Sequence, residues 1–277
     1  MGLRRQRQKH LRPKRRLDLH KTLFVLPNLI TLCGVFCGFN AIRLVSKDMP
    51  TADDVYRAAL LLIFAMFFDL MDGRVARLTR TQSAFGLQLD SLADIVSFGV
   101  APSLLVYKWA LYRAPVAGIF AAFLFVAAAA VRLARFNVLS SSSTGTPTKP
   151  GKYIIGLPTP PSTGILVALI IASHGSGGVL GTEPYTALLF AVTIGLSFLM
   201  VSNVRFRSFK ELKLNTGTVL FVLFTIASSA FVWSRFRPQF VLIYLLSVYI
   251  VIGIVESIRA LLVKLTTPAR DSVPPVA

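Results

Sequence analysis

Cysteine, histidine and acidic residues are all scarce in this chain of 277 residues. It has 2 cysteines, 3 histidines and 12 acidic residues, against 30 lysines and arginines. Cys33 and Cys37 lie four residues apart in an apolar run, on one face of a helix, with no histidine or further cysteine nearby to complete a metal site. We therefore expect both to pack structurally rather than to do redox chemistry. None of the histidines is placed to act at the acidic residues discussed below.

Charged side chains are also few, at 15% of the residues, whereas hydrophobic residues make up 54% and the mean hydropathy is +0.66. Because a helix needs about 20 mostly apolar residues to cross a bilayer, this composition predicts an all-α, polytopic transmembrane helix bundle of about eight spans. The fifth apolar stretch is short, which leaves six or seven spans open if it is re-entrant or peripheral. The candidate spans are residues 22–45, 56–79, 88–111, 115–138, 160–174, 184–202, 216–233 and 239–265.

The excess of positive charge, formally +18, is unevenly distributed. With the N-terminus in the cytoplasm, 23 of the 30 basic residues fall on the inner side, which is the positive-inside pattern of membrane proteins. The seven on the outer side are Arg43, Lys47, Arg57, Lys108, Arg113, Arg235 and Arg237. This orientation predicts that the stretch of residues 69–94 lies near the cytoplasmic face.

Three regions are expected along the chain. Residues 1–21 are too basic and too poor in apolar residues to pack, and they predict a disordered cytoplasmic tail. Anionic lipid would attract this tail by about 1 kcal/mol per basic residue, and nucleic-acid binding is the weaker alternative. Residues 22–265 form the membrane domain, and residues 266–277 a polar C-terminal tail.

Four of the twelve acidic residues stand inside or at the ends of apolar runs: Asp69, Asp72, Asp90 and Asp94. A carboxylate at the centre of a bilayer costs about 2.5–3.5 kcal/mol on insertion scales. Four such groups would together cost about 10–14 kcal/mol, which is comparable to the stability of a whole fold. Something must offset this, and bound cation is the evident candidate.

The spacing of the four aspartates supports a metal site. Asp69 and Asp72 are three residues apart and Asp90 and Asp94 four apart, so each pair lies on one helix face. The short connection between the two helices lets them run antiparallel, with the pairs facing each other. Such a set of hard oxygen ligands suits Mg²⁺ or Mn²⁺. Two metals about 3.5–4 Å apart would fit, as in enzymes of phosphoryl transfer.

The residues between the pairs suggest what the metals hold. Gly73 and Ala76 lie on the face of Asp69, Gly86 lies one turn before Asp90, and their small size lets a phosphate or a helix approach closely. Arg77 can pair with a phosphate in a fork geometry. Singly, these features fit a proton relay, helix packing or positive-inside anchors. Together they indicate a metal–pyrophosphate site.

The pattern D-x-x-D-G-x-x-A-R, eight residues, then G-x-x-x-D-x-x-x-D is matched at every fixed position in residues 69–94. It resembles the motif of the CDP-alcohol phosphotransferase (phosphatidyltransferase) family, integral membrane enzymes of phospholipid synthesis. Flanking stretches are similar to the bacterial phosphatidylserine synthase branch. These are LPNLITL at 26–32, FGVAPSLLVY at 98–107, RLARFNV at 132–138, GLPTPP at 156–161 and SNVRFRSFK at 202–210.

The resemblance implies roles for individual residues. Asp69, Asp72, Asp90 and Asp94 would bind the metals, with Asp94 also the general base. The CDP-lipid would contact Asn28, Thr31, Gly73, Arg77, Ser83 and Gly86. The acceptor would contact Arg135, Asn137, Thr159, Asn203 and Arg205, chosen for their positions at the cytoplasmic face.

The reaction that the resemblance implies is transfer of the phosphatidyl group from CDP-diacylglycerol to L-serine, giving phosphatidylserine and CMP. Two divalent cations, a homodimer, and a multi-pass position in the cell membrane with the active site facing the cytoplasm belong to the same expectation. Glycerol 3-phosphate, inositol phosphate or a second phospholipid stay open as acceptors. From a different class, a cation-coupled transporter using the aspartates stays open too, although no repeat is apparent.

Overall fold

The computed structural model describes residues 19–140, 153–178, 181–207 and 239–266, together with six isolated positions between 225 and 234. The described part is almost wholly helical. Its α-helices are α1 (Leu19–Val45), α2 (Ala52–Leu78), α3 (Ala84–Asp94), α4 (Ala101–Trp109), α5 (Pro115–Ser140), α6 (Thr159–Gly175), α7 (Thr186–Val201) and α9 (Gln239–Thr266). A π-helical segment, η1 (Ile95–Val100), joins α3 to α4. Short 3₁₀ turns are η2 (Leu111–Arg113) and η4 (Glu183–Tyr185), and the strands are β1 (Tyr153–Ile155) and β2 (Arg205–Arg207).

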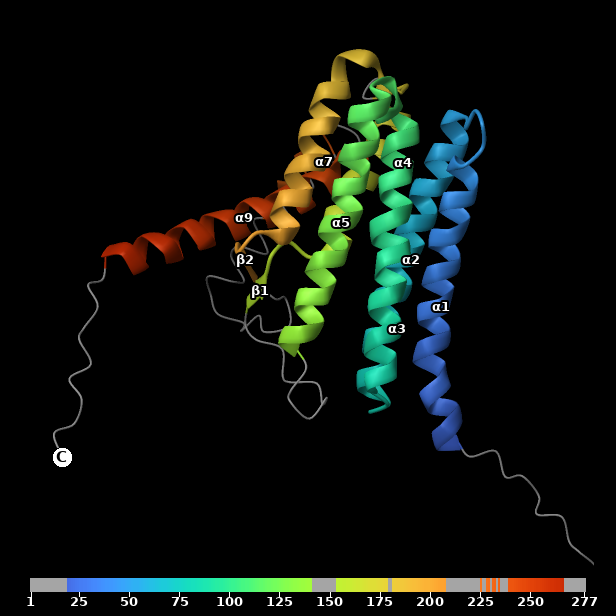
Figure 1. Ribbon diagram of the computed structural model, residues 1–277, viewed down its shortest axis with the longest axis vertical. Coiled ribbons are helices and arrows are strands. Elements are labelled where there is room, and N and C mark those ends of the chain that lie inside the picture. Colours follow the sequence, from blue (N-terminus) through green and yellow to red (C-terminus); the bar gives the residue numbers. More distant parts are fainter. Residues whose placement is uncertain are drawn as a thin grey trace, which may run out of the picture.

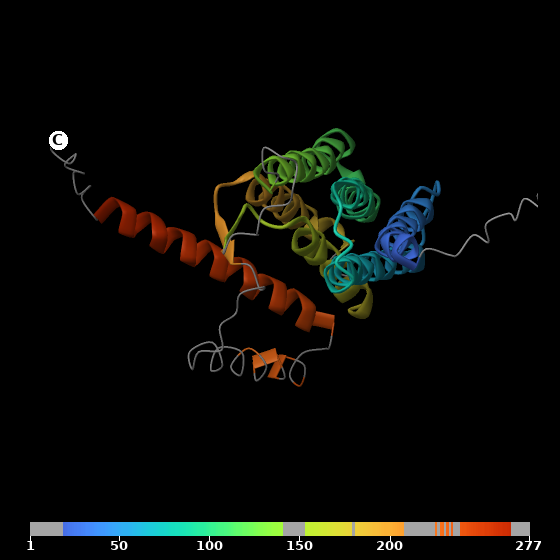
Figure 2. The ribbon, with the colours of Figure 1, turned by 90° about the horizontal axis from the view of Figure 1, so that it is seen from below.

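The helices form a bundle with one helix set apart. Figure 1 shows α1, α2, α3–α4, α5 and α7 side by side along the long axis of the molecule. Seen along that axis in Figure 2, α9 extends away from the bundle. β1 and β2 pair antiparallel, with Ile154 opposite Phe206. A Cβ at Gly253 of α9 would overlap the ring of Phe206, so the absence of a side chain at this glycine lets α9 pack closely against β2.

Five of the described helical segments are long and apolar enough to cross a membrane, where the sequence predicts about eight spans. They are Val25–Val45, Ala84–Trp109, Pro115–Leu139, Glu183–Val201 and Phe240–Arg259. The predicted span 56–79 is the 27-residue helix α2, which carries more charge than these five because of its aspartates and arginines. The short fifth stretch is α6, a helix of 17 residues. The predicted span 216–233 lies outside the described residues, apart from a few isolated positions, and so do both predicted tails for most of their length.

α6 is central to the packing rather than peripheral. Its side chains Ile165 and Leu166 belong to the hydrophobic cluster built with α5 and α7. Val167 and Ile170 belong to the cluster built with α1, α2 and α4. Every residue from 162 to 168 is buried, which is typical of a helix that is apolar all round and surrounded by other helices.

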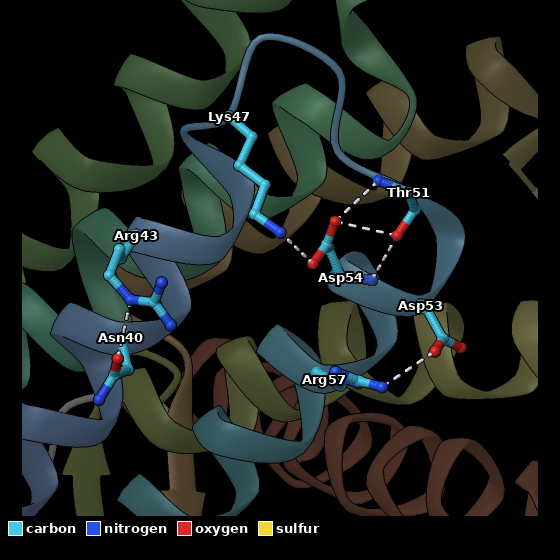
Figure 3. A network of polar contacts seen from close by, with 7 residues as sticks. All are labelled: Asn40, Arg43, Lys47, Thr51, Asp53, Asp54 and Arg57. Carbon is cyan, nitrogen blue, oxygen red and sulfur yellow. Dashed lines mark hydrogen bonds and ion pairs between the residues drawn. The ribbon is translucent and has the colours of Figure 1, made fainter.

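The turn between α1 and α2 is fixed by a network of polar contacts (Figure 3). Thr51 and Asp54 form a capping box, in which each side chain accepts the backbone N–H of the other residue. Lys47 donates from Nζ to Asp54 Oδ1 at 2.6 Å. The Lys47 hydrogen bond, with those from Thr51, lowers the pKa of the Asp54 carboxyl from 3.8 to about 2. Arg57 reaches Asp53 one helical turn earlier, at 3.3 Å.

Candidate active site

One pocket contains all four aspartates that the sequence singles out. It holds about 200 Å³ of empty space, part of it open to solvent, and opens between α1, α2, α3 and η1. Its lining residues are Thr31, Gly34, Ala65, Asp69, Asp72, Asp90, Ala93, Asp94, Ser97 and Phe98. Residues more than 60 positions apart in the chain therefore meet at one place, and most of the polar ones are carboxylates.

Asp69 and Asp72 from α2 and Asp90 from α3 bring carboxylate oxygens within 4.8 Å of one another. Asp72 is 5% exposed and the other two are half-buried. Like charges held this close repel, and a divalent cation between them removes that repulsion. The donors are all carboxylate oxygens, which fits Mg²⁺ or Mn²⁺ and not a metal that prefers histidine or cysteine.

Thr31 of α1 holds one of these carboxylates in place. Its Oγ1 donates to Asp72 Oδ2 at 2.6 Å and also lies 3.1 Å from the carbonyl oxygen of Pro27. Thr31 is 7% exposed, so this hydrogen bond is shielded from water. Partners of this kind orient metal-binding carboxylates. The sequence predicts a nucleotide contact for Thr31, and the structure places its hydroxyl on Asp72.

Asp94 and Arg132 form the inner part of the site. Asp94 ends α3, is 9% exposed and lines the same pocket, but it lies outside the group of three carboxylates. Arg132 on α5 is 8% exposed, and its positive charge acts on Asp94 and Asp69. No ion pair joins Arg132 to Asp94, both of which the structure describes. A buried cation thus lies near Asp94 without forming an ion pair with it.

The guanidinium of Arg132 is only partly satisfied. Nη1 donates to Thr159 Oγ1 of α6 at 2.9 Å, while Nε has no hydrogen-bond partner within the part of the chain that the structure describes. A buried N–H without a partner costs about 1–3 kcal/mol, so the position favours an anionic ligand. Arg132 is not among the site residues predicted from the sequence. The signal was there, because a cation inside the run AAAAVRLARF is as costly in a membrane as the aspartates are.

The residues predicted to contact the nucleotide lie in two places beside the pocket. Arg77 is exposed, and its Nη1 lies 3.6 Å from where a Cβ on Gly73 would stand, so the guanidinium lies over the glycine. Ser83 caps α3, its Oγ accepting the backbone N–H of Gly86 at 3.0 Å. A Cβ on Gly86 would lie 3.5 Å from Asn28 Oδ1, so the side chain of Asn28, from α1, lies beside the start of α3.

Two of the predicted acceptor residues, Arg135 and Asn203, contact each other at the end of α7. Arg135 donates from Nη1 to Asn203 Oδ1 at 3.4 Å and to the carbonyl oxygen of Val201 at 3.2 Å. Its Nη2 donates to the carbonyl oxygen of Ser202 at 3.3 Å. These bonds satisfy carbonyls that a helix leaves open at its C-terminus, so Arg135 fastens α7 to α5.

The other three predicted acceptor residues are not gathered with that pair. Asn137 donates to Ser91 Oγ at 2.9 Å and thereby links α5 to α3. Thr159 is fully buried and holds Arg132. The side chain of Arg205 lies outside the described residues, although its backbone belongs to β2. Thr159 is linked to the aspartates through Arg132, because the charges of Asp94 and Asp69 act on that guanidinium.

Comparisons with known proteins cover most of the chain. The family model for CDP-alcohol phosphatidyltransferase matches residues 24–252. A Helicobacter pylori protein named CDP-diacylglycerol–serine O-phosphatidyltransferase is 36% identical over 234 residues, which cover 84% of this chain and 91% of that protein. A Bacillus subtilis protein of the same name is 36% identical over 67% of this chain and 92% of its own length. A Mycobacterium tuberculosis protein of that name is 31% identical over 80% and 75%. This chain therefore belongs to the CDP-alcohol phosphatidyltransferase family.

Proposed function

We propose that this protein transfers the phosphatidyl group from CDP-diacylglycerol to L-serine, giving phosphatidylserine and CMP. The observation that carries the proposal is the cluster of Asp69, Asp72 and Asp90 beside Asp94. It stands in a chain that is similar over 84% of its length to a serine O-phosphatidyltransferase. Membership in a family of transferases argues against the alternative hypothesis of a cation-coupled transporter. That alternative also leaves Gly73, Arg77 and Gly86 without a role.

The three clustered carboxylates, with Asp94 beside them, would hold two divalent cations, Mg²⁺ or Mn²⁺. When bound, such cations neutralise the charge on the phosphoryl oxygens and favour displacement at phosphorus. Thr31 keeps Asp72 directed into the pocket. Asn28, Ser83 and Gly86 at the start of α3, with Gly73 and Arg77 on α2, would take the CDP portion of the lipid.

Asp94 is the residue proposed to accept the proton of the acceptor hydroxyl. The hydroxyl oxygen attacks the β-phosphorus, which carries the diacylglycerol. The bond from that phosphorus to the bridging oxygen breaks, and CMP leaves with the electron pair. Burial of Asp94 keeps bulk water away from the reacting groups.

The acceptor proposed from the chemistry of Arg132 is an amino acid with a short side chain. Serine carries its hydroxyl and its carboxylate on neighbouring carbon atoms, so a hydroxyl at Asp94 brings the carboxylate close by. Arg132 offers a buried guanidinium with Nε unpartnered for that carboxylate. Among the described residues, Arg132 is the one buried Lys or Arg, and a single buried cation suits one carboxylate better than a phosphate group that carries more charge.

The proposed carboxylate contact predicts the behaviour of an Arg132→Lys variant. Lysine keeps the charge but loses the planar fork that pairs with a carboxylate, so the KM for serine should rise about tenfold or more while the KM for CDP-diacylglycerol stays unchanged. Arg113→Lys, in η2 just before α5 and over the ring of the exposed Tyr112, is the matched control. Equal serine KM values in the Arg132 variant and the wild type would remove Arg132 from the acceptor pocket.

The placement in the membrane is part of the same proposal. The protein would cross the cell membrane with about eight spans, with its catalytic helices α2 and α3 meeting near the cytoplasmic face, because the basic residues are concentrated on that side. The basic tail would lie on anionic lipid, and two copies would form a homodimer. A pocket near the membrane surface lets the lipid tails stay in the bilayer while the head group reaches the carboxylates.

Release of CMP from CDP-diacylglycerol by the purified protein in detergent tests the function. The assay is run with L-serine, glycerol 3-phosphate, inositol phosphate and no acceptor, each with Mn²⁺ or Mg²⁺ and after removal of metal. We expect release with serine and a divalent cation only. Release with a phosphorylated acceptor in place of serine would make the acceptor assignment wrong. Full activity after metal removal would contradict the role of the cations, and no release with any acceptor would contradict the proposed chemistry.

A further inference from the structure

The helix that carries Asp94 changes its winding immediately after that residue. From Ile95 to Val100 the chain is π-helical, and the backbone N–H of Ala101 donates to the carbonyl of Val96, five residues earlier. α3 before this segment and α4 after it are ordinary α-helix. Segments of π-helix are rare and occur frequently at functional sites, because they change the direction of neighbouring side chains.

Pro102 gives the chemical reason for the irregular segment. In an α-helix the N–H of residue 102 would donate to the carbonyl of Phe98, but proline has no N–H. Thr163 of α6 supplies a donor instead, with its Oγ1 2.7 Å from the carbonyl oxygen of Phe98. Thr163 is fully buried and Phe98 is 1% exposed, so no water can take the place of this hydroxyl.

The same segment is held from α1 on another side. Ser97 donates from Oγ to the carbonyl oxygen of Gly34 at 3.2 Å, inside the protein. A Cβ on Gly38 would stand 2.9 Å from the Cα of Ser97, so the backbones of α1 and η1 are in direct contact there. On the α5 side, a Cβ on Gly99 would lie 3.5 Å from Ala129. The π segment is therefore fixed between three helices, and the carboxylate of the preceding residue is fixed with it.

We infer that Thr163 is a positioning residue for the transfer reaction: its hydroxyl holds the π turn that directs the Asp94 carboxylate at the acceptor hydroxyl. This inference rests on the proposed function, because it assigns the benefit to proton transfer at Asp94. Thr163 itself does not line the pocket, and it acts through its hydrogen bond to Phe98, which does. The pocket-lining residues Ser97 and Phe98 are the link between α6 and the site.

The test compares Thr163→Val and Thr163→Ser with a matched control. Valine has the shape of threonine without the hydroxyl, so kcat for CMP release should fall about tenfold or more, since small misplacement of a catalytic group is costly. The KM for CDP-diacylglycerol should stay within about twofold, and serine, which keeps the hydroxyl, should restore kcat. Thr193→Val removes another fully buried hydroxyl, one bonded within α7 to the carbonyl of Leu189, and should leave kcat unchanged.

A double variant separates positioning from stability. Pro102→Ala combined with Thr163→Val returns a backbone N–H to the carbonyl of Phe98 in α-helical geometry, which also serves if the single valine variant does not fold. A folded double variant with low kcat supports the inference. Wild-type kcat in either valine-containing variant overturns it. If the wild type and the Thr193→Val control release no CMP with serine, the proposed function itself fails, so the two failures are distinguishable.

Discussion

The two ends of α2 carry acidic residues in opposite electrostatic settings. At the N-terminal end, Asp54 accepts hydrogen bonds from Lys47 and from Thr51, the cap of its own helix, and Asp53 pairs with Arg57 (Figure 3). The helix dipole favours negative charge at this end as well. Each carboxylate is thus neutralised by groups of the protein itself, and the result is a fixed turn between two helices.

The other end of α2 concentrates negative charge instead. Asp72 lies eighteen residues after Asp54, about 27 Å along the helix, and shares its surroundings with Asp69 and Asp90. Arg132, the buried cation nearby, forms no ion pair with Asp94. Carboxylates satisfied by their own chain stabilise a structure, whereas carboxylates gathered against one another are arranged for a ligand that brings positive charge.

The largest expected effect, on the rate of CMP release, comes from replacing Asp94 by Asn. Without a base, CMP release should fall about 10²–10⁴-fold, while binding of the CDP-lipid persists. The matched change Asp53→Asn, on the charge-neutralised end of α2, should leave turnover at the wild-type rate. Steady-state kinetics and a binding assay with the nucleotide lipid measure both quantities. Undiminished turnover by the Asp94 variant would remove this residue from the role of base.

A smaller effect, on metal affinity, is expected from removing the hydroxyl of Thr31 at the Asp72 end of α2. In Thr31→Val, Asp72 loses the 2.6 Å hydrogen bond that directs it, and affinity for Mn²⁺ should fall about 10–100-fold. Titration of the melting temperature with Mn²⁺ measures this affinity, since a cation that binds the folded state raises stability. Thr31→Ser should keep wild-type affinity. The same affinity in the valine variant would show that Thr31 does not orient a metal ligand.

The smallest effect is expected at the neutralised end, from pH. The pKa of Asp54 lies at about 2 in the fold, below its usual value of 3.8, so the folded state binds a proton less readily than the unfolded state. Its contribution to stability is therefore complete above about pH 4 and is lost as pH falls through about 2. Melting temperatures of wild type and Asp54→Asn should differ at pH 6 and converge toward pH 2. A constant difference across this range would contradict the role of the Lys47–Asp54 contact.

The sequence predicts the clustering of the aspartates better than the contacts of the proposed acceptor residues, for a physical reason. Asp69 and Asp72 lie on one helix, where spacing alone sets their common face, and a short turn brings Asp90 back to them. Arg135 and Asn137 also stand on one helix, but their partners come from α7 and α3, far away in the chain. Spacing carries no information about such partners, so neither the bonds at the end of α7 nor the Arg132–Thr159 contact was foreseen.

The count of spans shows the same limit. Mean hydropathy locates the apolar stretches, and the long described helices overlap them, with ends that differ by a few residues. It does not reveal that α6 is enclosed by its neighbours or that α2 combines the length of a span with the charges of a site. Both properties depend on what surrounds a helix, which a window along one chain does not contain.

By itself, the sequence determined the membrane class of the chain, the helix faces of the four aspartates and the resemblance to a family. These follow from composition and from spacing within single helices. The tertiary structure alone decided that Thr31 holds Asp72, that Arg132 lies buried and half-satisfied near Asp94, and that Thr163 completes the π turn at Phe98. Each of these joins two helices whose relative placement is set by packing of the whole bundle.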